Sequence, residues 1–379
     1  MGEDLFILMV APHACIRVAK EAAALRGLGY HVSLLTESGR VPDNADTYDG
    51  VYTYTPNDPA SFSSVLKTIS SRYDIIHYHN EPSYLMEVVR EVTGFQKPLI
   101  FDYHDSNYWR EDRDVSLDSL GESLAWHHED VAVSMADGIV FPSEPCMEEF
   151  KSRPEHKFSK NSMIALPPAV PRSMYVYGEF DFVGGLVSQG GHINPERARG
   201  DRWRDYSELY KYLKEHSRKR IVALSSVFQE GDGRDKEAYS YYAGLGVLAG
   251  FYPYHLLLLR LPRHSWNMVG NWYGDSPDDQ MNGYKKLSGT WIGGKAWRVA
   301  SPNKFFDSLA AGIPSVIMNA PHIAEEAKEV SLIVDHPQEL LDRWDEHRHY
   351  RALVHKKRTE FCMENYIGSL VELYKEVMR

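Results

Sequence analysis

Short apolar runs alternate with amphipathic segments along the first part of the chain. Phe6–Val10 is continuously apolar, and Ile16–Leu28 carries alanines and leucines at helical spacing until Gly29 ends the pattern. Further apolar runs predict buried strands at Val32–Leu35, Ile75–Ile76, Leu99–Phe101 and Ile139–Phe141. Strands that alternate with helices in this way indicate a parallel sheet with helices on both faces, so the predicted fold class is α/β.

A proline-rich segment, Leu166–Arg172, separates this series from a second one. Each proline fixes its own φ and lacks a backbone donor, so the segment cannot continue a helix or a central strand. The second series predicts strands at Phe180–Val183, Ile221–Leu224, Leu256–Leu259, Ser315–Met318 and Leu332–Val334, and a final one-sided helix over Thr359–Met378. We expect domains at 1–168 and 173–358, with 359–379 forming a terminal helix.

Size and composition agree with two globular domains. The chain has 379 residues, of which 43% are hydrophobic and 25% charged. A net charge of −11 disfavours broad attachment to nucleic-acid backbones. The three cysteines are scattered, which argues against a disulfide framework or a thiolate zinc site. No apolar stretch approaches the ~20 residues that cross a bilayer, and we expect a cytoplasmic location without a transmembrane segment.

The densest chemical signal is SPNKFFDSLAAGIP, residues 301–314. Ser301 or Asn303 can cap a helix there, and exposed amides at a helix start suit phosphate oxygens. Lys304 opposes the helix dipole, so a bound anion is a natural reason for it. Asp307 follows one turn later, where it can accept hydrogen bonds from vicinal hydroxyls, as an acid does toward ribose. Alternatively, this is only a capped helix with a solvated lysine.

This segment resembles the donor-site motif of family-four glycosyltransferases, which pairs Asn-Lys with an aromatic residue, Glu, Ala-Ala-Gly and Pro. The resemblance implies the GT-B fold, two facing Rossmann-like domains whose C-terminal helix returns to the N-terminal domain. It also implies transfer from a nucleotide-diphosphate sugar to an acceptor hydroxyl, with retention. Lys304 would meet the diphosphate, and Asp307, in place of the usual Glu, would hold the ribose.

Other segments extend the resemblance over most of the chain. Phe182–Leu186 is similar to the glycine loop near the donor phosphates, which implies roles for Gly184 and Gly185, and Arg204 precedes the next helix. His104, in FDYHD, matches the family histidine that faces the transferred sugar. One departure is Val299, which stands eight residues before Asp307, where many relatives carry the first of two glutamates, the one that touches the sugar. The resemblance implies no metal and no tightly bound cofactor.

Several alternatives stay open at this stage. Asp105 is a candidate acceptor base. His13, His77, His79, His104 and Asp105 could instead cluster around zinc in a hydrolase, since imidazole and carboxylate suit that metal. An epimerase on the same fold, or a binding protein without turnover, is also possible. The acceptor, whether glycan, lipid-linked sugar, small molecule or modified nucleic-acid base, depends on loops such as 107–126, and the oligomeric state is open.

Overall fold

The computed structural model describes residues 5–79, 82–104, 129–152, 162–190, 192, 205–225, 228, 235–272 and 302–379. These residues form two compact units. Unit 1 holds the described residues up to Ser173 and again from Met363, and unit 2 holds those from Met174 to Cys362. The chain therefore passes from unit 1 to unit 2 just after the proline-rich segment and returns to unit 1 near its end.

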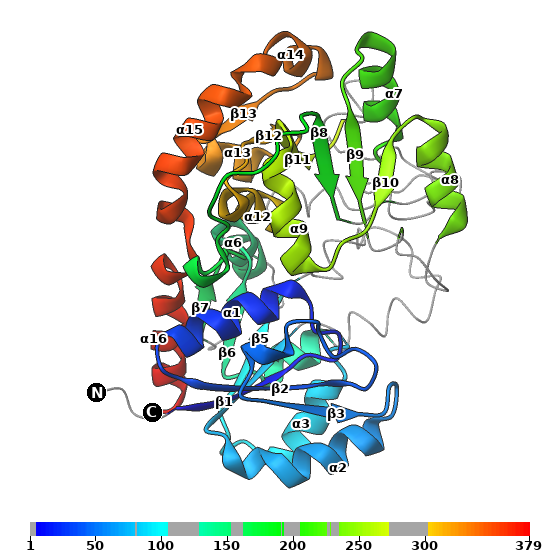
Figure 1. Cartoon of the computed structure of the whole chain (residues 1–379). Coiled ribbons are helices and arrows are strands. Elements are labelled where there is room, and N and C mark those ends of the chain that lie inside the picture. The colour runs from blue at the N-terminus through cyan, green and yellow to red at the C-terminus, as the bar shows by residue number, and fades with distance from the viewer. Residues whose placement is uncertain are drawn as a thin grey trace. The chain divides into compact units, whose positions relative to one another are not determined.

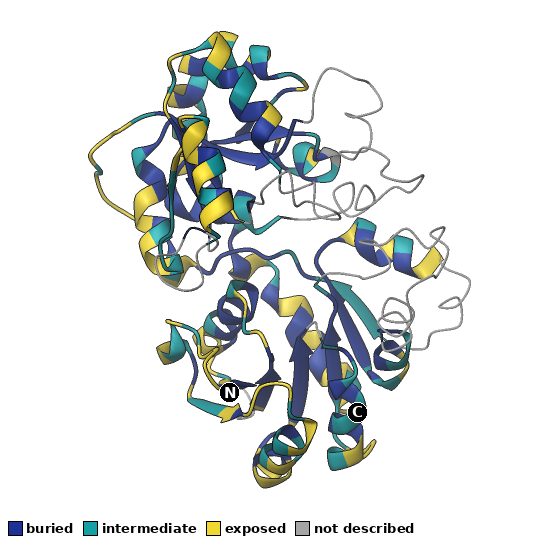
Figure 2. Ribbon diagram, turned by 90° about the vertical axis from the view of Figure 1, so that its right-hand side faces the viewer, coloured by how far each residue is buried: buried dark blue, intermediate teal, exposed yellow. Residues whose placement is uncertain are grey.

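Unit 1 is built on a parallel sheet of seven strands in the order β3-β2-β1-β4-β5-β6-β7. The strands are β1 Phe6–Val10, β2 His31–Glu37, β3 Gly50–Tyr54, β4 Ile75–His79, β5 Leu99–Asp102, β6 Gly138–Phe141 and β7 Ser162–Ala165. The central strands are buried on both faces (Figure 2), as parallel sheets require. The strand order reverses between β1 and β4, where such sheets bind ligands beyond their carboxyl ends.

Helices cover both faces of this sheet (Figure 1). They are α1 Ile16–Gly27, α2 Pro59–Ile69, α3 Leu85–Thr93, α6 Glu144–Ser152 and α16 Ile367–Val377, with short 3-10 turns at Ala45–Thr47, Ser70–Arg72, Arg172–Met174 and Met363–Asn365. Helix α2 begins after Asp58, whose carboxylate accepts from the backbone N–H of Ala60 and Ser61. Helix α16 packs on β7 and α1, so the end of the chain completes unit 1.

Unit 2 repeats the plan with a parallel sheet of six strands in the order β10-β9-β8-β11-β12-β13. The strands are β8 Leu186–Gln189, β9 Ile221–Leu224, β10 Leu248–Gly250, β11 Trp266–Gly270, β12 Ser315–Met318 and β13 Ser331–Ile333. Its helices are α7 Ser207–His216, α8 Lys236–Gly244, α9 Tyr254–Arg260, α12 Asn303–Ala311, α13 Pro321–Ala327, α14 Pro337–Asp342 and α15 His347–Lys357, with 3-10 turns at Leu261–Arg263, Trp344–Glu346 and Arg358–Phe361.

The two faces of the unit 2 sheet have different cores. One face packs large aromatic side chains, including Trp266, Tyr206 and Tyr210, against α7 and α8. The other face packs Val187, Val222 and aliphatic residues of α9 and α12. Here the strand order reverses between β8 and β11, so the carboxyl ends of these two strands mark the expected ligand crevice.

Two predicted strands are wrong. Leu256–Leu259 belongs to helix α9, in which Leu258 is buried while Leu256 and Leu259 are exposed, so the leucine run packs on one side only. Phe180–Val183 is irregular chain, because Phe182 and Val183 are exposed and Gly184 and Gly185 take positive φ. Strand β8 starts only after them. The predicted terminal helix is shorter, since residues 359–366 include two 3-10 turns before α16 begins at Ile367.

Candidate functional site

Unit 1 gathers titratable side chains where β4 and β5 end. His77 and His79 lie on the last residues of β4, Asp102 ends β5, and His104 follows two residues later. Adjacent parallel strands bring these positions together, since His79 is in register with Asp102. Helix α1 adds Arg17 and Glu21 from its first turns, and Cys15 is its N-cap residue. We call these seven residues the histidine cluster.

His104 is tied to three neighbours within the histidine cluster. Its Nε2 lies 3.3 Å from Asp102 Oδ1 and 3.3 Å from His79 Nδ1. Its Nδ1 lies 3.6 Å from the Sγ atom of Cys15. The side chain is 9% exposed, so its orientation is fixed by contacts rather than by solvent. Asp102 was not singled out from the sequence, although it ends the strand that leads to His104.

Arg17 supplies the fixed positive charge of the histidine cluster. Its Nη2 lies 3.1 Å from Asp102 Oδ1, and its Nε lies 2.9 Å from Glu21 Oε1. All three side chains are at most 3% exposed. Buried charges require partners of opposite sign, and the guanidinium provides one to the Asp102 carboxylate, whereas burial and the nearby Asp102 raise the pKa of Glu21 well above its ordinary range.

The same contacts set the protonation of the cluster. Burial would lower the pKa of His104, but the Asp102 carboxylate and Cys15 raise it to about 10, so the ring is an imidazolium at neutral pH. Burial would raise the pKa of Asp102, but Arg17 and His104 hold it well below its ordinary range. Burial lowers the pKa of His79 to about 4, which leaves that ring neutral. A permanent imidazolium can donate hydrogen bonds but cannot act as a base.

The zinc alternative can be tested against this geometry. Glu21, His77, His79 and Asp102 have ligand atoms within 4.8 Å of one another, a spacing that could hold a metal ion. Arg17 contacts both carboxyl groups, but both Glu21 oxygens, Asp102 Oδ1 and the Nε2 atoms of His77 and His79 are buried with no hydrogen-bond partner among the described residues. His13, which the zinc hypothesis included, instead lies 3.3 Å from Glu37. The donor set is therefore compatible with a guanidinium-centred network and also with a bound metal ion.

Unit 2 places Lys304 on the first turn of α12, at the carboxyl end of β8. The Lys304 carbonyl accepts from the side-chain amides of Gln189 at 3.3 Å and Asn267 at 3.1 Å, which ties the start of α12 to β8 and β11. The ammonium contacts the hydroxyl of Tyr206 and lies 5.0 Å from the centre of its ring. No carboxylate in the described part of the chain contacts this ammonium.

A buried histidine supports the same region. The ring of His192 contacts the hydroxyl of Tyr210 at 2.9 Å and the carbonyl of Gly190 at 3.0 Å, and its ring centre lies 4.7 Å from that of Tyr206. Burial, with Lys304 nearby, lowers the pKa of His192 to about 3, so this ring adds no charge. The only signal for it in the sequence is its place in QGGH after an apolar run.

Asp307 lies one turn after Lys304 and is 4% exposed. Its Oδ1 accepts a hydrogen bond of 2.6 Å from the hydroxyl of Tyr254, the first residue of α9. Tyr254 follows β10 by four residues, so α9 and α12 meet at the carboxyl edge of the sheet. The pairing fixes the carboxylate on the helix face that the sequence predicted, and Tyr254 is a partner that the sequence did not reveal.

The glycine loop is a correction to the sequence assignment. Gly184 and Gly185 precede β8, at its amino end, and a Cβ on Gly185 would lie 2.5 Å from the Arg220 carbonyl oxygen. Gly190 follows β8 at the carboxyl end, has φ +105°, and a Cβ there would lie 2.9 Å from Lys304 Cε. Ligands bind at the carboxyl ends of parallel strands, and it is Gly190, not Gly184 or Gly185, that lies at this end of β8.

The other residues predicted for the site either lie outside the described ranges or sit at the ends of α12. Asp105, Arg204 and Ser301 lie outside the described residues, as does the loop at 107–126. Asn303 is the first residue of α12 and not its cap, because the N-cap residue is Pro302 and no side chain caps the helix. Gly312 ends α12 with φ +74°, the left-handed conformation expected of a glycine there.

Part of the chain resembles a known family of glycosyltransferases. Residues 16–160 match the family described as Glycosyltransferase Family 4. A comparison with curated proteins gave no significant match. None of the helices in the described ranges is long and apolar enough to cross a membrane.

The similar solved structures include Alr3699/HepE from Anabaena in complex with UDP and glucose, with TM-score 0.61 at 12% identity, covering 98% of this chain and 100% of that one. An α-glucosyltransferase in complex with UDP-glucose and DNA containing an abasic site has TM-score 0.61 at 11% identity, covering 99% of each chain. AviGT4, involved in avilamycin A biosynthesis, has TM-score 0.56 at 13% identity, covering 99% of this chain and 98% of its own.

The two parallel sheets define the GT-B fold. The match of residues 16–160 to Glycosyltransferase Family 4 agrees with this fold and indicates a glycosyltransferase.

Proposed function

We propose that the chain transfers a sugar from a nucleotide-diphosphate donor bound in unit 2, with the diphosphate held by Lys304 and Gly190. The observation that carries this proposal is an ammonium without a carboxylate partner in the described chain, at the start of α12 and beside a glycine with positive φ. A phosphate oxygen is the anion that suits a lysine at a helix start, where the backbone N–H groups also point outward.

The ribose would be held by Asp307. A carboxylate that accepts from Tyr254 keeps a fixed direction, and carboxylates bind vicinal hydroxyls with paired hydrogen bonds. Lys304 and Asp307 are three residues apart on one helix, so they can meet neighbouring parts of a nucleotide. The UDP in two of the similar structures supports a uridine nucleotide as the first donor to test.

His104 would face the transferred sugar from unit 1. As the leaving diphosphate departs, negative charge develops on its oxygens, and fixed positive groups stabilise that charge. With Nε2 held by Asp102, the Nδ1–H of the imidazolium, 3.6 Å from Cys15 Sγ, would exchange this weak acceptor for a sugar hydroxyl and keep its proton at neutral pH. The family likeness favours retention of the anomeric configuration, and Asp105 stays a proposal as acceptor base.

The proposal is tested by calorimetric titration of nucleotide sugars into wild type and Lys304→Ala. A charge-assisted contact contributes about 1.5–3 kcal/mol, so we expect donor affinity to fall by about 10- to 100-fold. Lys236→Ala is the matched control, since Lys236 is an exposed lysine near the start of another helix of unit 2. Equal donor affinity in wild type and Lys304→Ala would rule out the assigned phosphate site.

A second measurement separates transfer from epimerisation. Incubation with donor alone should give only slow hydrolysis, and the released sugar should keep its stereochemistry at the other carbons. Proton NMR of the product with an acceptor should show the anomeric configuration of the donor. A new sugar epimer without acceptor would favour an epimerase instead.

A further inference from the structure

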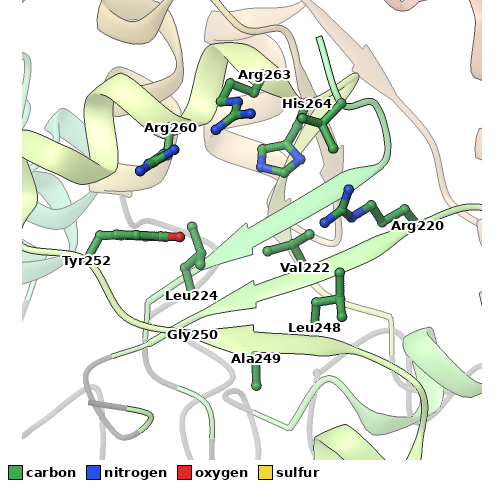
Figure 3. Close-up of a pocket in the computed structure, with 11 residues that line it drawn as sticks. Arg220, Val222, Leu224, Leu248, Ala249, Gly250, Tyr252, Arg260, Arg263 and His264 are labelled. Atoms are coloured by element: carbon green, nitrogen blue, oxygen red, sulfur yellow. The ribbon is translucent and has the colours of Figure 1, made fainter. Parts of the chain in front are cut away.

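Unit 2 contains a cavity that belongs to no part of the proposed donor site. It measures about 310 Å³ and lies between the face of β9 and β10 and the chain from α9 to His264 (Figure 3). Its floor is apolar, formed by Val222 and Leu224 of β9 and Leu248 of β10. Arg220 stands at the amino end of β9, the opposite end of the sheet from Lys304.

Three guanidinium groups face this cavity, from Arg220, Arg260 and Arg263 (Figure 3). Among the described residues that line it, none is acidic. Arg260 lies 5.3 Å from the ring centre of Tyr252, and Arg263 donates to the backbone carbonyl of Asp181 at 3.3 Å. By contrast, other arginines of the protein lie within 3.1 Å of a carboxylate, as seen for Arg17, Arg26, Arg40, Arg90 and Arg343. A positive cavity in a chain of net charge −11 favours an anionic ligand.

The wall that carries Arg263 is held in place by buried contacts. Arg351 donates to the carbonyls of Pro262 and His264. His264 is 7% exposed, and its Nδ1 lies 3.2 Å from the carbonyl oxygen of Gly184. These bonds fix the segment that follows α9, so Arg263 projects from an ordered support and can bind without a large ordering cost.

Exposed apolar side chains line the charged cavity and also lie on α9, the helix that contributes Arg260 to it. Val183 and Leu248 line it and are 36% and 49% exposed. Leu256 and Leu259 are 40% and 45% exposed on α9, and each stands four residues before an arginine of the cavity. Residues four apart share one face of a helix, so α9 and the turn after it present leucine and arginine together. Exposed apolar groups beside basic ones are typical of surfaces that lie on membranes.

We propose that this face of unit 2 docks on a bilayer that contains anionic phospholipid. A headgroup phosphate enters the cavity between Arg220, Arg260 and Arg263, because guanidinium groups bind phosphate oxygens in pairs. Leu256 and Leu259 enter the interfacial region beside it. Attachment of this kind is peripheral and reversible, and it requires no helix that spans the bilayer.

The test is co-sedimentation of the whole protein with vesicles of phosphatidylcholine, with and without phosphatidylglycerol. We expect binding to the mixed vesicles only. Arg220→Ala/Arg260→Ala removes two exposed arginines and should weaken binding about tenfold or more, from the usual contribution of each basic residue at an anionic surface. Arg72→Ala/Arg348→Ala removes the same charge at exposed positions away from the cavity and should bind like wild type.

Two further results decide the proposal. Leu256→Ser/Leu259→Ser should weaken vesicle binding with the arginines intact, which a purely electrostatic attraction would not show. Failure to bind mixed vesicles, or an equal loss in the Arg72/Arg348 control, would overturn membrane docking. Thermal stabilisation by inorganic phosphate, without vesicle binding, would assign the cavity to a soluble phosphate ligand and overturn it as well. Thermal melts of each variant confirm that it folds.

Discussion

The histidine cluster of unit 1 and the Lys304 region of unit 2 both lie at the carboxyl ends of central strands, yet their charges are arranged in opposite ways. In the histidine cluster, Asp102 forms ion pairs with Arg17 at 3.1 Å and with His104 at 3.3 Å. Around Lys304 the described neighbours are aromatic or neutral, such as Tyr206 and His192. In the first arrangement charges of opposite sign are paired, and in the second no carboxylate of the described residues contacts the positive charge.

This contrast indicates different tasks. A buried ion-pair network fixes the orientation of a side chain and keeps it protonated. These properties suit a residue such as His104, which is proposed to donate a hydrogen bond to the substrate. A cation placed among neutral groups suits the binding of an anion, because no internal acid competes for it. We therefore expect mutations in the histidine cluster to affect catalysis and stability together, and mutations near Lys304 to affect donor binding selectively.

The largest effect is expected from His104→Ala. Loss of a positioned donor at the reaction centre typically lowers the rate about 10²- to 10³-fold, and we expect such a fall in kcat. Donor affinity, measured by calorimetry, should stay near that of wild type because the proposed nucleotide site lies in unit 2. A large loss of donor affinity with unchanged kcat would assign His104 to binding and break the proposed division.

Asp102→Asn should change the pH dependence. The pKa of His104 is raised from 6.5 to about 10, so the folded state gains stability from the bound proton below pH 6.5 and loses it as pH rises toward 10. Removing the carboxylate lowers that pKa, so the activity of the variant should begin to fall at a lower pH than in wild type. Activity profiles and the free energy of unfolding from pH 6 to 10 measure this shift.

Asp102→Ala is the matching stability test. Removing one partner of a buried ion pair costs about 3–5 kcal/mol of folding stability. In this variant the Arg17 guanidinium stays buried but loses the Asp102 carboxylate as its partner. Urea unfolding should report this loss. A cost below about 1 kcal/mol is typical of exposed ion pairs and would contradict the buried ion-pair network.

The two ends of β8 offer a paired test with glycine substitutions. Gly190→Ala places a methyl group 2.9 Å from Lys304 Cε, and Gly185→Ala places one 2.5 Å from the Arg220 carbonyl oxygen. Both positions have positive φ, so each substitution should cost about 1–3 kcal/mol of stability. Only Gly190→Ala should also weaken donor binding in a titration. Equal donor affinity in the two variants would contradict the proposed contact between Gly190 and the donor diphosphate.

The smallest effect is expected from Tyr254→Phe. This substitution removes the hydrogen bond to Asp307 and keeps the ring, so the loss should be about 1 kcal/mol, or about fivefold in donor affinity. Tyr239→Phe, at a partly buried tyrosine of α8, serves as the control. No change in affinity for Tyr254→Phe would mean that Asp307 does not depend on this bond.

The sequence predicted the alternation of strands and helices well where apolar runs were short and bounded by glycine. Phe6–Val10, Ile221–Leu224 and Ser315–Met318 are strands with the predicted bounds. Leu256–Leu259 was wrong because a run of four leucines does not distinguish a strand from a helix buried on one side. Strands such as β3, with polar and aromatic residues and partial burial, gave no continuous apolar signal.

Site prediction depended on local motifs and failed where contacts are long-range. Lys304 and Asp307 could be proposed from one segment, because helix geometry fixes their spacing. Asp102 lies 85 residues from Arg17 in sequence, and only the sheet brings them together. Gly190 was overlooked because the strand was predicted too early, which moved the glycine loop to the wrong end of β8.

The most direct test of the account is a crystal structure of the protein with a nucleotide diphosphate. We predict that a phosphate oxygen lies within hydrogen-bond distance of Lys304 Nζ, next to Gly190, and that the ribose hydroxyls contact Asp307. A diphosphate bound elsewhere, with the first turn of α12 making no contact to it, would contradict the central claim.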